Sequence, residues 1–128
     1  GLLECLEIKG VRKVLEYFNK RSIPCYVASG GDQDEVRSVL KSRGLSRYFD
    51  GVYGSPLSKK ENLALISCDI ESLSSGIFFG DAKSDLMAAR EYGLDFIFVS
   101  GASEWREGLD VCRQSNLLSI VNFDGIRV

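Results

Sequence analysis

Two carboxylates four residues apart form the strongest chemical feature of the sequence. Asp81 follows the apolar run 77–79 and a glycine, and Asp85 lies in the first turn of the next helical pattern. Acids that converge where a strand ends suit a hard cation such as magnesium (Mg2+), which takes one or two carboxylates with water and phosphate oxygens. In a simpler interpretation, Asp81 caps a turn and Asp85 complements a helix dipole. The pair alone leaves both interpretations open.

A serine followed by two glycines ends an earlier apolar run. The run 25–28 leads directly into Ser29, Gly30 and Gly31. Backbone N–H groups beside a hydroxyl can hold a phosphoryl oxygen. An ordinary turn between a strand and a helix would have the same composition. The acids that follow disfavour an anion pocket at the start of that helix; they are Asp32, Asp34 and Glu35.

Two lysines stand at a predicted helix start, where cations are disfavoured. Ser58 and Glu61 have the spacing of a capping box, which places Lys59 and Lys60 in the first helical turn. The helix dipole opposes positive charge there. Such a lysine could neutralise a bound phosphate or pair with the carboxylates of residues 81 and 85. A solvated lysine pair without function would cost little at an exposed position.

Alternating strands and helices would position these residues. Periodicity predicts helices over 8–22, 32–43, 58–68 and 85–92, and a further helix with Trp105, Leu109 and Cys112 on one face. Apolar runs predict strands over 25–28, 51–53, 77–79, 96–99 and 119–123, the last at an edge. Continuously apolar strands are typical of a parallel sheet covered on both faces. We expect one domain, residues 1–128, with a three-layer α/β/α fold and its ligands beyond the carboxyl ends of the strands.

Composition excludes several classes of function. The 128 residues include no histidine, so Ser-His-Asp, Cys-His and His-ligated zinc mechanisms are excluded within this chain. The 16 basic and 18 acidic residues are intermixed, so we expect no nucleic-acid partner. The four cysteines form no C-x-x-C pair, and buried reduced thiols fit a cytoplasmic protein. No apolar run approaches the roughly 18 residues of a membrane span, so we expect no membrane partner.

Taken together, these segments resemble the haloacid dehalogenase-like (HAD) hydrolase superfamily. In that family a Ser or Thr ends one strand, a lysine begins a helix, and a G-D-x-x-x-D run follows another strand. This sequence has Ser29, Lys59 and the run Gly80–Asp85 in the same order. The resemblance extends from about residue 8 to residue 124 and implies a Rossmann-like HAD core with a mainly parallel sheet.

The resemblance also implies an activity. It indicates a magnesium-dependent phosphatase that hydrolyses a small phosphorylated metabolite through an aspartyl-phosphate. Ser29 and Gly30 would bind the phosphoryl group, and Lys59 would balance charge on the nucleophile and the phosphate, with Lys60 as the alternative. Asp81 and Asp85 would hold Mg2+. These acids favour a phosphatase, because the dehalogenase branch of the family needs no magnesium.

One motif of the family has no counterpart in the sequence. The D-x-D-G-T motif supplies the nucleophile and the general acid/base, and nothing before Ser29 resembles it. The resemblance therefore implies an N-terminally truncated core, with residues 1–7 a possible remnant of the cap or a linker, and with the central first strand missing. We expect this chain alone to be inactive. We also expect the exposed slot in its sheet to favour pairing with another segment or self-association.

Two alternatives compete with the truncated phosphatase. The chain could be a non-catalytic HAD-like module for binding or regulation, or a receiver-like doubly wound module whose acids merely cap helices. Residual magnesium affinity would separate the first two hypotheses from the third, because capping carboxylates would not bind the ion. The sequence upstream would separate the phosphatase from the non-catalytic module.

Overall fold

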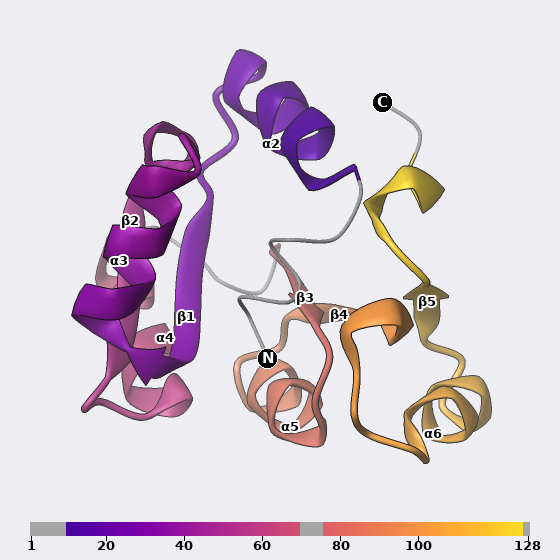
Figure 1. Cartoon of the computed structure of the whole chain (residues 1–128). Coiled ribbons are helices and arrows are strands. Elements are labelled where there is room, and N and C mark those ends of the chain that lie inside the picture. The colour runs from indigo at the N-terminus through magenta and orange to yellow at the C-terminus, as the bar shows by residue number, and fades with distance from the viewer. Residues whose placement is uncertain (1–9, 70–75, 127–128) are drawn as a thin grey trace.

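Strands and helices alternate along the described part of the chain, residues 10–69 and 76–126 of a computed structural model. In chain order the elements are α2 (Val11–Lys20), β1 (Tyr26–Asp32), α3 (Gln33–Ser42), β2 (Gly51–Ser55), α4 (Lys59–Asp69), β3 (Ile77–Gly80), α5 (Lys83–Glu91), β4 (Asp95–Val99), α6 (Gly108–Gln114) and β5 (Leu118–Ile120) (Figure 1). Short 3-10 helices lie at η1 (Ser46–Tyr48), η3 (Ser100–Ala102) and η4 (Phe123–Gly125). The α/β class predicted from the sequence is confirmed.

The strands form two parallel sheets. β1 pairs with β2, and β4 lies between β3 and β5, so that β5 is an edge strand as expected. Within residues 10–69 and 76–126, no strand pairs with β1 on the side away from β2 or with β3 on the side away from β4. β1 and β3 lie on the sides of the two sheets that face each other (Figure 1). This is the place where the family resemblance puts the missing central strand.

Helices cover both faces of the β1–β2 sheet. Successive residues of a strand point to opposite faces, and β1 follows this rule. Val27 packs with Leu15 of α2 and Leu40 of α3. Tyr26 packs on the other face, against a cluster that includes Leu63 of α4. The sheet is therefore the middle layer of three.

The β3–β4–β5 sheet has the same layers. Phe98 belongs to a cluster with Leu86 of α5 and Cys112 of α6. Val99, the next residue along β4, packs with Val14 of α2 and Phe123 of η4. α2 thus contributes to the cores of both sheets from one side. On the other side, α4 and α5 share a cluster that includes residues of β1 and β3.

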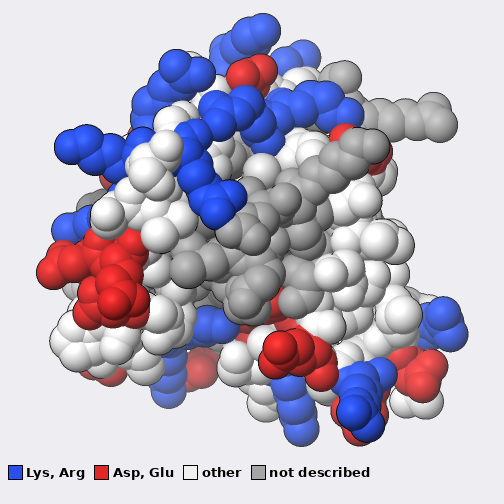
Figure 2. All heavy atoms as spheres, viewed as in Figure 1, with Lys and Arg blue, Asp and Glu red and all other residues white. Residues whose placement is uncertain are grey.

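Positive side chains gather on the surface over α2 (Figure 2). The exposed cations of this helix and its C-cap are Arg12, Lys13, Lys20 and Arg21. The Arg12 guanidinium donates to the carbonyl oxygen of Arg43 at 2.6 Å, at the end of α3. Lys20 and Arg21 complement the negative end of the α2 dipole. Charge is therefore less evenly mixed on this surface than along the sequence.

The structure corrects several expected boundaries. Trp105 precedes α6, which begins at Gly108, and is not on its face. The last strand covers only 118–120, because residues 123–125 form η4 with Asn122 as its cap. Cys68 is exposed, whereas Cys112 is buried and Cys25 half-buried, so the expectation of buried thiols is wrong for Cys68. None of the described helices has the length and apolar character needed to cross a membrane.

Gly10, at the start of α2, packs closely against η4. Gly10 is the N-cap of α2 with φ 89°, and a Cβ there would lie 2.5 Å from Asp124 Oδ1 and 2.7 Å from the Phe123 carbonyl carbon. Gly44 has a similar φ of 69°, but a Cβ there would meet no atom within 4 Å. The two glycines therefore share a left-handed backbone and differ in the space around them.

Replacing these two glycines by alanine should separate backbone strain from close packing. Gly44→Ala should lower the free energy of unfolding by about 1 kcal/mol, because only left-handed strain is added. Gly10→Ala should cost about 1–3 kcal/mol more, because the methyl group forces η4 away from α2. Equilibrium denaturation in urea measures both values. Equal losses would show that the contact between Gly10 and η4 does not form.

Candidate active site

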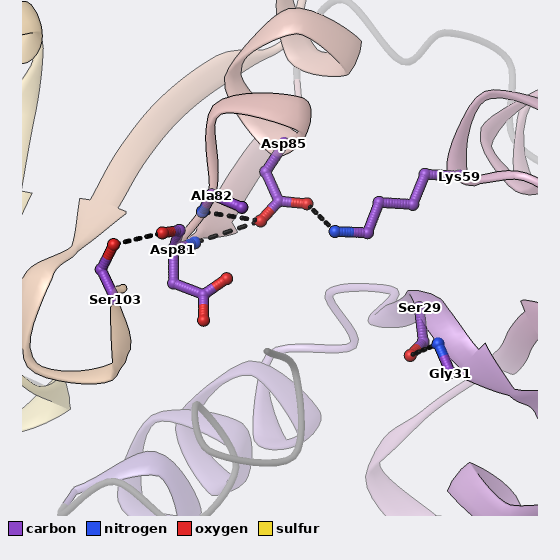
Figure 3. A network of polar contacts seen from close by, with 7 residues as sticks. All are labelled: Ser29, Gly31, Lys59, Asp81, Ala82, Asp85 and Ser103. Atoms are coloured by element: carbon purple, nitrogen blue, oxygen red, sulfur yellow. Dashed lines mark hydrogen bonds and ion pairs between the residues drawn. The ribbon is translucent and has the colours of Figure 1, made fainter. Parts of the chain in front are cut away.

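Asp85 lies at the centre of a polar network between the two sheets. It is the third residue of α5, and 5% of its side chain is exposed. Its Oδ2 accepts the backbone N–H of Asp81 at 3.1 Å and that of Ala82 at 3.2 Å. Its Oδ1 contacts Lys59 Nζ at 2.5 Å (Figure 3). Gly80 makes room for this side chain, because a Cβ there would lie 2.5 Å from Asp85 Cβ.

Lys59 reaches Asp85 from the first turn of α4. The predicted capping box forms: Glu61 N–H donates to Ser58 Oγ at 3.1 Å, and Ser58 N–H donates to Glu61 Oε1 at 3.2 Å. The Lys59 side chain is 24% exposed. Its charge opposes the helix dipole, and the carboxylate of Asp85 offsets that unfavourable placement.

Lys60 points elsewhere. Its Nζ contacts Glu91 Oε1 at 2.8 Å on the exposed surface. The hydrogen bond that Lys60 donates to Glu91 raises the pKa of the Lys60 ammonium. Of the two lysines proposed for the motif position, the structure brings only Lys59 to the acids of the G-D-x-x-x-D run.

Ser29 and Gly30 lie on the other side of Lys59. Ser29 is buried in β1, and its Oγ accepts the N–H of Gly31 at 3.0 Å. This contact leaves the hydroxyl hydrogen available for donation to another acceptor. A Cβ on Gly30 would lie 3.8 Å from Lys59 Cε. The lysine side chain therefore passes close to β1 at Gly30 on its way to Asp85.

Asp81 is held through its backbone. It follows β3 directly and is buried. Its N–H donates to Asp85, and its carbonyl oxygen accepts the hydroxyl of Ser103 at 2.5 Å. The carboxylate turns away from both of these contacts (Figure 3). The two peptide groups that flank the Asp81 Cα atom are thus fixed by Asp85 and Ser103.

The two acids offer different possibilities to a metal ion. Both Asp85 oxygens accept hydrogen bonds from protein donors. Among residues 10–69 and 76–126, no group of three or more His, Cys, Asp or Glu side chains is placed to hold a metal. Mg2+ needs only one or two carboxylates when water and phosphate oxygens complete its shell. The two buried carboxylates of Asp81 and Asp85 therefore fit a magnesium ion whose other ligands are water and phosphate oxygens.

Sequence reasoning missed two polar residues near this site. Ser100 directly follows β4, but its Oγ donates to the Ile120 carbonyl oxygen, and Ser103 contacts Asp81 instead. Asn62 in α4 is fully buried, and its Oδ1 has no hydrogen-bond partner among the described residues. A polar residue three positions after Lys59, just before the buried Leu63, was the available signal for Asn62.

Comparison with known proteins relates this arrangement to one family. Residues 3–99 match the family model of haloacid dehalogenase-like hydrolases. No curated protein matches the chain significantly.

Several solved structures have a similar fold. A HAD-superfamily hydrolase from Ehrlichia chaffeensis aligns with a TM-score of 0.73 and 23% identity, over 92% of this chain and 54% of that one. A haloacid dehalogenase-like family protein from Streptococcus pneumoniae (TM-score 0.72) and a predicted phosphatase from Clostridium acetobutylicum (0.71) are each 23% identical, over 87% of this chain and 54% of theirs. The chain therefore spans about half the length of these proteins.

Neutralising Asp85 should destabilise the chain much more than neutralising Glu91. Asp85→Asn leaves Lys59 without its counter-ion in a largely buried place, and we expect a loss of about 1–3 kcal/mol in the free energy of unfolding. Glu91→Gln removes an exposed pair and should leave the urea midpoint unchanged. If both variants unfold at the wild-type midpoint, the contact between Lys59 and Asp85 does not hold the two sheets together.

Proposed function

This chain belongs to the haloacid dehalogenase-like hydrolase family, and from that premise we propose that the intact protein is a magnesium-dependent phosphatase of small phosphorylated metabolites. The observation that supports the proposal is the contact between Lys59 Nζ and Asp85 at 2.5 Å. It joins the start of α4 to the start of α5, and a Cβ on Gly30 would lie 3.8 Å from Lys59 Cε, so that an ammonium and a buried carboxylate meet close to β1, the strand that carries Ser29. Phosphoryl transfer depends mainly on such positioning and neutralisation of charge.

Each residue has a distinct part in the proposed reaction. The Ser29 hydroxyl donates its hydrogen to a phosphoryl oxygen, because Oγ already accepts from Gly31. Gly30 allows the phosphate to approach the backbone. Lys59 neutralises negative charge on the phosphate and on the attacking carboxylate. Asp85 orients Lys59 and fixes the loop through two backbone N–H groups.

Asp81 would hold the magnesium ion. When bound, Mg2+ neutralises phosphate charge and orients the transferred group. The carboxylate of Asp81 is the group best placed for this role, because its direction is set by contacts to its own N–H and carbonyl oxygen. Asp85 would be the second ligand, because its Oδ1 accepts only one protein donor and keeps a lone pair for the ion.

The nucleophile would come from a strand between β1 and β3. A carboxylate at the end of a strand in that position would face Lys59, and its attack on phosphorus would form the aspartyl-phosphate. We propose that a segment upstream of Ser29 in the intact protein supplies this strand, with a second copy of the chain as the alternative occupant. Without a nucleophile the chain alone has no turnover.

One observation favours a second candidate, a HAD-like module for binding or regulation. The 128-residue sequence has no D-x-D-G-T motif, and no described strand occupies the place between β1 and β3. A module that retained Ser29, Lys59 and Asp81 would still bind phosphate and magnesium, but would not hydrolyse an ester. Turnover by the full-length protein separates this candidate from the phosphatase.

Hydrolysis of p-nitrophenyl phosphate tests the proposal in two proteins. The 128-residue chain should release no p-nitrophenol, whereas the full-length protein encoded by its gene should release it in a magnesium-dependent way. In the full-length protein, Asp81→Asn or Lys59→Ala should lower kcat by roughly 100-fold or more, as for loss of one preorganised charge-stabilising group. Lys60→Ala is the matched control and should keep full activity.

Three outcomes would contradict parts of this scheme. Magnesium-dependent release by the 128-residue chain, abolished in Asp81→Asn, would show that the chain alone is competent. Full activity of the full-length Lys59→Ala variant would remove the lysine from the mechanism. Magnesium binding by a full-length protein without turnover would favour the non-catalytic module.

A further inference from the structure

Ser103 contacts the backbone of Asp81 from the loop that follows β4. Its hydroxyl donates to the Asp81 carbonyl oxygen at 2.5 Å, across 22 residues of sequence. Ser103 Oγ in turn accepts the backbone N–H of Trp105 at 2.9 Å. A serine hydroxyl can donate and accept at once, and here it uses both capacities to connect two loops.

The loop that carries Ser103 is itself anchored in the core. The Trp105 ring packs edge-on against Phe98, with 5.6 Å between centroids, and Phe98 is one of the most deeply buried residues of β4. The N–H that fixes Ser103 Oγ thus belongs to a residue that is held by the core. Ser103 transfers this rigidity to the Asp81 carbonyl group.

Asp81 is consequently held on both sides of its Cα atom. Asp85 accepts the N–H, and Ser103 donates to the carbonyl oxygen. Fixing both peptide groups sets the direction of the Cα–Cβ bond, and with it the place where the carboxylate can reach. Neither of these two contacts involves the carboxylate.

We propose that Ser103 is a positioning residue that sets the Asp81 carboxylate for magnesium. This inference rests on the proposed function, because it takes Asp81 as the group that holds the ion. Residues that orient metal ligands typically contribute 10–100-fold to metal affinity. Ser100 offers a contrast in the same loop, because its hydroxyl donates to the Ile120 carbonyl and not to Asp81.

Magnesium titration of the 128-residue chain tests the role of Ser103 without any assay of turnover. Isothermal titration calorimetry gives the affinity, and Trp105, the sole tryptophan of the sequence, gives a fluorescence signal close to Asp81. Ser103→Ala should weaken Mg2+ binding by roughly 10-fold or more. Ser103→Thr keeps the hydroxyl in an extended backbone that tolerates a β-branched residue, and should bind as wild type. Ser100→Ala should also bind as wild type.

A second variant guards against misfolding. Circular dichroism melting of each variant shows whether it folds, and if Ser103→Ala does not, Ser103→Cys retains the size of the side chain with only a weak donor. Weakened binding by folded Ser103→Cys supports the role of the hydroxyl. Wild-type affinity in a folded Ser103→Ala or Ser103→Cys variant overturns it.

The Asp81→Asn variant distinguishes failure of this inference from failure of the proposed function. If Asp81→Asn loses magnesium while Ser103→Ala binds as wild type, the metal site stands and the role of Ser103 falls. If wild type and Asp81→Asn give the same titration, Asp81 does not hold the ion, and both the metal role in the proposed function and the inference about Ser103 are overturned.

Discussion

The need to satisfy one largely buried carboxylate organises this molecule. A buried charge is costly unless it is paired and hydrogen-bonded, and Asp85 meets this condition with one ammonium and two backbone N–H groups. Those donors come from α4 and from the loop between β3 and α5. No strand ladder joins β1 to β3 within the described residues. The two sheets are instead held together by helices packed on their faces and, at the C-terminal ends of the strands, by the contact between Lys59 and Asp85. Gly80, Lys59 and the start of α5 are all arranged around it.

The two acids of the G-D-x-x-x-D run divide the work between them. Asp85 lies one helical turn beyond Asp81, so its side chain folds back over the loop and accepts the N–H of Asp81 itself. The carbonyl group of Asp81 is held separately by Ser103. A spacing of four residues thus lets Asp85 fix the loop that carries Asp81, which accounts for the burial of Asp85.

Local signals predicted most of the elements, and tertiary contacts decided what the sequence left open. The Ser58–Glu61 capping box and the continuously apolar strands involve neighbouring residues only, and both predictions are confirmed. The choice between Lys59 and Lys60 depended on where Asp85 lies, which no local pattern contains. Ser103 directly follows the 3-10 helix η3, and its contact with Asp81 depends on the path of the chain there. The spacing of Trp105, Leu109 and Cys112 fits one face of a helix, but α6 begins only at Gly108. Gly108 packs directly against Phe98, because a Cβ there would lie 2.5 Å from Phe98 Cζ.

The packing of α2 has a consequence for the order in which the chain folds. Each of the two sheets is built from segments that are neighbours in the sequence. In contrast, Gly10 and Val14 contact η4, which lies at the opposite end of the described chain. Contacts between segments so distant in sequence require closure of a long loop and tend to form late. We therefore expect that the two sheets are already formed in the transition state for folding, whereas α2 does not yet contact η4. Weakening that contact should then accelerate unfolding and leave the folding rate nearly unchanged.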